Sequence, residues 1–252
     1  MAWAALFNAD RTLAVQVVSP AVGAYFALLT GILLAFINHR VERVRDSHSA
    51  LNEAMALLNH NSVILGLSRH RLASLEDEYR EIVAKKQRSI SPVTFPSFDY
   101  TPQLGGRFLK DEMNNTYHAA LAELRKIDLN LHTLGEAHRQ LSELALNGSL
   151  DLEEYHHNLL SLIPQLRRGL LGCRVAESAV IDFIAMCRVM KETESSRYFL
   201  FFPNLTFSDQ QRERFSDARE WVVNSLERNM EASRQRMREA GIEPPNNFDP
   251  PR

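Results

Sequence analysis

The sequence predicts an all-α protein. A single N-terminal transmembrane helix is expected to continue into an elongated antiparallel bundle of about four long helices with coiled-coil-like packing. Three observations support this fold class. A long stretch near the N-terminus carries no charge, and apolar residues recur in helical steps of three, four and seven through most of the remaining chain. No alternating pattern long enough to build a sheet occurs.

The overall composition narrows the classes of partner. The chain has 252 residues and a formal net charge of −2, so it has no global attraction for nucleic acid or anionic lipid. Its only cysteines, Cys173 and Cys187, fall in one predicted helix, where their spacing corresponds to about 21 Å, too far for a disulfide. We therefore interpret them as small core residues in a reducing compartment.

The uncharged stretch, residues 13–37, predicts a transmembrane helix. It exceeds the roughly 20 residues that cross about 30 Å of hydrocarbon as helix. It is also longer than the apolar core of a cleaved signal peptide, and the residues after it form a poor cleavage site. Residues 1–12 are expected to form a short extracytoplasmic tail.

The charges that flank this stretch predict its orientation. Arg40, Arg43 and Arg45 follow it, whereas Arg11 before it is offset by Asp10. By the positive-inside rule, residues 38–240 form a helical cytoplasmic domain and the N-terminus lies outside. The expected location is the cell (inner or plasma) membrane.

A row of small residues recurs every four positions inside the stretch: Ser19, Gly23, Ala27, Gly31 and Ala35. Such a row lets two helix backbones approach closely in lipid. It predicts a packing face and a homo-oligomer, although transmembrane helices are rich in small residues in any case.

Heptad spacing predicts that the anchor continues as the first bundle helix to about Lys86, with these residues on one face: Ile37, Val44, Leu51, Leu58, Leu65, Leu72 and Tyr79. Prolines and a glycine pair mark residues 88–107 as an irregular connection. A second helix is expected from about Phe108 to Leu146, ended by Gly148, with His138 as a core histidine.

Asp151 is suited to cap a third helix, which keeps its heptad phase through Pro164 and is therefore expected to kink there. A second irregular connection covers residues 193–207. Ser208 and Gln211 have the spacing of a capping box that opens a fourth helix. Residues 241–252 are rich in proline and are expected to be a disordered tail.

Strictly antiparallel helices would place both irregular connections at the end remote from the membrane. Both are unusually aromatic, and aromatic loops need a cover. They predict either a cap that closes the bundle or a docking site for an unidentified cytoplasmic protein, formed by Phe95, Phe98, Tyr198, Phe199, Phe201, Phe202 and Phe207.

The sequence offers little for catalysis. Glu153 and Glu154 stand three residues before His156 and His157, as in di-iron helical bundles, but a second copy of the motif is missing. No nucleotide-binding, hydrolase or zinc motif occurs. Arginines of the fourth helix alternate with acidic residues, which is typical of a solvated face and not of a nucleic-acid surface.

We therefore expect a non-enzymatic, membrane-anchored interaction, signalling or scaffold protein, with no metal or cofactor, that self-associates and docks a partner. Two alternatives remain. One is a membrane-perturbing, pore-forming or toxin-like effector, suggested by the small-residue row with Gln16 and Thr30. The other is a metal-dependent helical-bundle oxidoreductase.

Overall fold

The computed structural model of the chain is almost entirely helical and describes residues 2–88, 93–100, 108, 111–193 and 208–239. Its helices are α1 (Ala2–Ala84), α2 (Asp111–Leu146), α3 (Leu152–Ser161), α4 (Ile163–Thr193) and α5 (Asp209–Glu239). None of these described residues forms a strand. The predicted all-α class is confirmed for this part of the chain.

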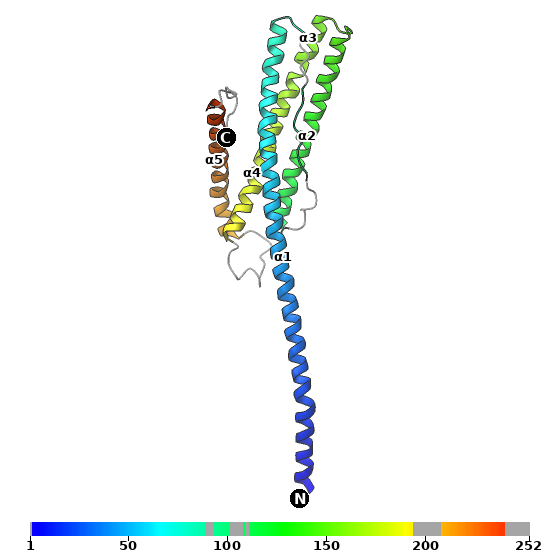
Figure 1. Cartoon of the computed structure of the whole chain (residues 1–252), viewed down its shortest axis with the longest axis vertical. Helices are drawn as coiled ribbons and strands as arrows, with labels where there is room; N and C mark the ends of the chain where they lie inside the picture. The colour runs from blue at the N-terminus through cyan, green and yellow to red at the C-terminus, as the bar shows by residue number, and fades with distance from the viewer. Residues whose placement is uncertain (1, 89–92, 101–107, 109–110, 194–207, 240–252) are drawn as a thin grey trace.

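The first helix, α1, is a single element of 83 residues, about 125 Å long at 1.5 Å per residue. Its N-terminal part projects from the other helices, and the side chains from Ala21 to Phe36 are exposed (Figure 1). Burial begins at Ser47, and the predicted heptad row is then confirmed, since these side chains are at most 1% exposed: Leu51, Leu58, Leu65, Leu72 and Tyr79.

The fourth helix, α4, is the central element, because it packs against α1, α2 and α5. Two of its glycines let the neighbouring helices come close. A Cβ added at Gly169 would lie 3.1 Å from a methyl carbon of Leu72 on α1, and one at Gly172 would lie 2.8 Å from a methyl carbon of Ile127 on α2. Both distances are shorter than ordinary side-chain contacts, so larger residues would push the helices apart.

The order of directions differs from the prediction. In Figure 1, α1 and α2 run the same way, away from the N-terminus, and α4 runs back toward the projecting part of α1. Cross-helix contacts agree: Tyr79 of α1 meets His138 of α2, and Arg88 just beyond α1 meets Ala145 further along α2. The expectation of a strictly antiparallel bundle was therefore wrong for α1 and α2.

An extended segment, residues 93–100, explains how two parallel helices follow each other in the chain, and we call it the strap. The strap contacts both helices. Asn61 of α1 is bonded to the backbone of Asp99, and the carbonyl of Val93 lies close to Gly135 of α2. The chain therefore returns along the bundle before α2 begins.

The predicted helix ends are confirmed in detail. The Asp151 carboxylate accepts a hydrogen bond from the backbone N–H of Glu154 and caps α3. Gly148 has φ +69° after α2. Ser208 and Gln211 exchange the two hydrogen bonds of a capping box at the start of α5. At Pro164 the structure goes further than a kink, because α3 ends at Ser161 and α4 starts at Ile163.

Candidate functional site

The N-terminal part of α1 is, among the described residues, long and apolar enough to cross a membrane. Its small-residue row is open: no atom lies within 4 Å of a Cβ added at Gly23 or Gly31, and Ala27 and Ala35 are exposed. The side chain of Ser19 lies outside the described part. The Thr30 hydroxyl donates a hydrogen bond to the Phe26 carbonyl at 2.8 Å, so it is satisfied within its own helix.

The three arginines predicted to set the topology lie between this apolar stretch and the bundle. The Arg40 guanidinium lies over the Phe36 ring, 5.2 Å from its centroid, while Arg43 and Arg45 are exposed. An arginine that stacks on the last aromatic ring of an apolar helix keeps its stem against apolar surface and its charge near water. This arrangement suits a membrane boundary.

Of the predicted aromatic docking site, the structure describes only Phe95 and Phe98. Phe98 of the strap is buried, at 5% exposure, and Phe95 is half-buried. The other candidates, Tyr198, Phe199, Phe201, Phe202 and Phe207, lie outside the described residues. The end of α4 and the start of α5 lie at the end of the bundle from which α1 projects (Figure 1), so placing the second connection at the opposite end was wrong.

The structure shows a groove between the strap and α2 that no sequence pattern indicated. Its volume is about 540 Å³, and on α2 it extends from Asp128 to Leu146. This volume is within the range of ligand-binding clefts, roughly 300–1,000 Å³. The groove was not predictable because its first wall is the strap, whose path along α2 has no periodic signal.

His138 lies in the lining of this groove and confirms the prediction of a core histidine. Its Nδ1 is 2.5 Å from the hydroxyl oxygen of Tyr79, and the two rings are stacked. Burial raises the pKa of Tyr79 above its usual value, so the tyrosine stays protonated. The pair joins α1 to α2 and rigidifies the floor of the groove.

A buried ion pair joins α1 to α4 in the middle of the bundle. Arg69 donates a hydrogen bond to Glu177 at 3.1 Å, and their side chains are only 11% and 7% exposed. Burial raises the pKa of Glu177, and the nearby Arg69 opposes that rise. Because an unpaired charge at this depth is costly, the pair fixes the register of the two helices.

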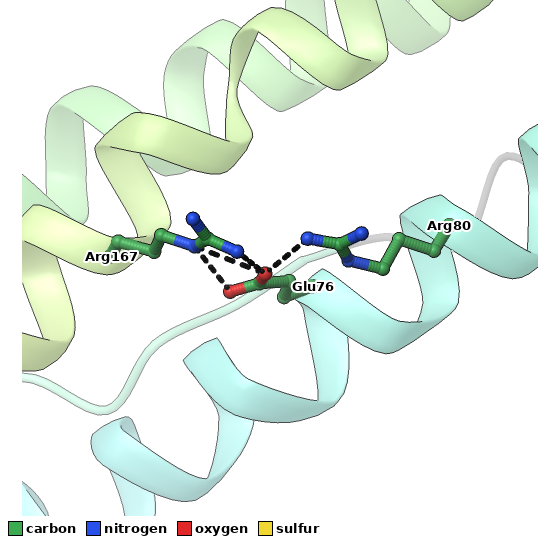
Figure 2. A network of polar contacts seen from close by, with 3 residues as sticks. All are labelled: Glu76, Arg80 and Arg167. Atoms are coloured by element: carbon green, nitrogen blue, oxygen red, sulfur yellow. Dashed lines mark hydrogen bonds and ion pairs between the residues drawn. The ribbon is translucent and has the colours of Figure 1, made fainter.

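A second polar contact between α1 and α4 lies nearer the surface (Figure 2). Arg167 of α4 approaches Glu76 with Nε and Nη2, the closer contact being 2.7 Å, and Arg80 reaches the same carboxylate at 2.9 Å. The hydrogen bonds from Arg167, followed by those from Arg80, hold the pKa of Glu76 below its usual value despite partial burial. This cluster supports the helix pairing and contains no group that suits catalysis.

Two kinds of reactive group, metal clusters and thiols, can be checked among the described residues. No three histidine, cysteine or acidic side chains among them are arranged to hold a metal ion, and the His156 ring lies 2.9 Å from the Gln87 carbonyl oxygen. Cys173 and Cys187 are buried on α4. Burial raises the pKa of the Cys173 thiol to about 12 and also raises that of Cys187. Neither thiol is therefore an accessible nucleophile.

Comparisons with models of protein families, with curated proteins and with solved structures give no match.

Proposed function

We propose that this protein is a membrane-anchored helical interaction or signalling protein without catalytic activity, which self-associates through its anchor and docks a partner through its bundle. One observation carries the proposal. The apolar stretch and the first bundle helix are the same uninterrupted helix, α1. A change in the position or pairing of the anchor therefore moves the bundle directly.

In this proposal residues 13–37 span the cell membrane and the bundle lies in the cytoplasm, where the two buried cysteines stay reduced. The exposed arginines after the span support this orientation. The bundle starts near Ser47, about 15 Å beyond the end of the apolar stretch at 1.5 Å per residue. That distance holds it clear of the lipid head groups.

Self-association is tested by cysteine cross-linking of the full chain in membranes. Val41 is exposed on α1 just beyond the apolar stretch, so Val41→Cys places one accessible thiol on each copy. The two native cysteines are buried and should not cross-link. The unsubstituted chain serves as the control for this. Oxidation should give a covalent dimer only with Val41→Cys, since a disulfide needs Cα atoms within about 7 Å.

Gly23→Leu combined with Gly31→Leu should reduce this cross-linking several-fold, because the larger side chains keep the backbones apart. Ala21→Leu is the matched control, since Ala21 lies about 200° around the helix from Gly23 and is also exposed. Loss of the dimer in the glycine variant alone supports the proposal. Association through this face would be refuted by equal dimer yields for Val41→Cys alone, with both glycine substitutions and with Ala21→Leu. The absence of a dimer in all three of these chains would also refute it.

A further inference from the structure

The groove between the strap and α2 has a wall that is already in place. The side chain of Asn61, which is fully buried, donates to the Asp99 carbonyl at 2.8 Å and accepts from the Asp99 N–H at 3.0 Å. Phe98 beside it is buried in the core. Two backbone hydrogen bonds and one aromatic anchor thus fix the strap on α1, which leaves its other side facing α2.

The surface of the groove is mainly apolar. Val93, Phe95 and Pro96 of the strap are half-buried, so part of each remains accessible. Leu146 at one end is 65% exposed, so its apolar surface is also accessible. At Gly135 the helix has no side chain, and an added Cβ would meet only the Val93 carbonyl at 3.9 Å and the Phe95 ring at 4.0 Å.

The rim of the groove is acidic. Asp128, Glu136 and Glu143 lie along the α2 side with one arginine, Arg139, which leaves a net charge of −2 when the lining histidines are neutral. Arg139 is shared, because it donates to Glu136 at 2.8 Å and also to Glu143. All three of these side chains are more than 40% exposed. Both carboxylates are thus accessible, and one arginine balances only half of their charge, so this rim favours a partner that brings a second cation.

The arginines near the two ends of the groove do not neutralise these glutamates. Arg125 lies over the Tyr100 ring, 5.6 Å from its centroid. Arg88 donates to the backbone carbonyls of Ala145 and Leu150. The net charge of −2 thus consists of −1 from Asp128 at one end of the groove and −1 from Glu136, Glu143 and Arg139 together, next to the apolar wall.

We propose that this groove binds an extended segment of a partner protein that carries a lysine or arginine between apolar side chains. The apolar residues of the segment pack on Phe95, Pro96 and Leu146, and its cation pairs with the exposed acidic rim of α2 beside Arg139. This inference deepens the proposed function, since it gives the docking site and the chemistry of the partner. It does not depend on the pairing of the anchors.

The test uses the full chain in nanodiscs of phosphatidylcholine, a lipid without net charge that does not itself attract basic peptides. A library of short random peptides displayed on phage is selected on these nanodiscs, with empty nanodiscs as the background. The enriched peptides should carry lysine or arginine flanked by apolar residues. Their affinities are then measured by fluorescence anisotropy with labelled synthetic copies.

Two variants remove different properties of the groove. Gly135→Leu fills the floor at a helical position that prefers leucine to glycine, and Glu136→Lys with Glu143→Lys reverses the rim charge. Each should weaken the selected peptide roughly tenfold or more. Glu213→Lys with Glu220→Lys makes the same charge change on the exposed face of α5 and should leave binding unchanged. Circular dichroism confirms that each variant is folded.

Three outcomes would overturn the inference: no enrichment over empty nanodiscs, enriched peptides without basic residues, or equal affinity for the parent chain and both groove variants. None of these outcomes affects the cross-linking result for the anchor. The failure of the groove and the failure of the proposed self-association are therefore distinguishable.

Discussion

The buried Arg69–Glu177 pair allows a quantitative prediction, because its side chains are 11% and 7% exposed and 3.1 Å apart. Removing one partner takes the direct counter-charge away from the other, which stays buried. Arg69→Met alone and Glu177→Leu alone should therefore each lower the free energy of unfolding by about 3–5 kcal/mol. The double variant replaces both charges with apolar side chains and should be within about 1 kcal/mol of the parent, or more stable.

The assay is denaturant unfolding of the full chain in detergent, followed by helical circular dichroism, with the four chains treated as a double-mutant cycle. The pH dependence provides a second check. Burial raises the pKa of Glu177 in the folded state above its unfolded pKa, so stability is lost as pH rises from the unfolded pKa through the folded pKa. Arg69→Met removes the opposing cation, and its destabilisation should be larger at pH 8 than at pH 5. Single variants that cost less than about 1 kcal/mol, or a double variant as unstable as the sum of the singles, would refute the reasoning.

Three further predictions concern other contacts. Asn61→Ala removes both hydrogen bonds to the backbone of Asp99, so hydrogen exchange of the strap should become faster while α2 stays protected. Unchanged exchange of the Asp99 amide would contradict the role of Asn61 in holding the strap. The pKa of Glu76 is lowered in the folded chain, so this residue contributes stability above its usual pKa of 4.5, and the contribution is lost as pH falls through the folded pKa. In Glu76→Gln, the free energy of unfolding should therefore fall less steeply as the pH is lowered. Cys173 and Cys187 should resist iodoacetamide in the folded chain and react after denaturation, whereas labelling of native protein detected by mass spectrometry would show that α4 opens.

The sequence predicted the helices and their buried faces well, because helical periodicity is a local property. Leu51, Leu58 and Leu65 repeat every seven residues and are buried together. His138 occupied a core position in the pattern and is indeed buried, although its partner Tyr79 could not be named. Caps such as Asp151 were also predictable, since each depends on residues only three positions apart.

The direction of α2 was not predictable from such patterns. Residues 85–110 connect α1 to α2, and at about 3.3 Å per residue they can reach roughly 85 Å, more than the length of α2. A connection of that length permits a parallel neighbour as readily as an antiparallel one. The contact that holds the strap, Asn61 with the backbone of Asp99, joins positions 38 residues apart and leaves no sequence signature. The groove was missed for the same reason.

The uninterrupted course of α1 has a geometrical consequence. Each residue turns an α-helix by about 100°, so the number of residues between Gly31 and Leu51 determines which way the bundle points relative to the small-residue face. One added residue near Arg43 would swing the whole bundle through more than a quarter turn around the anchor. Seven added residues would return the bundle to within about 20° of its original orientation and move it roughly 10 Å farther along the helix axis. In a pair of chains that associate through the small-residue face, the length of this short segment thus determines the directions in which the two bundles point.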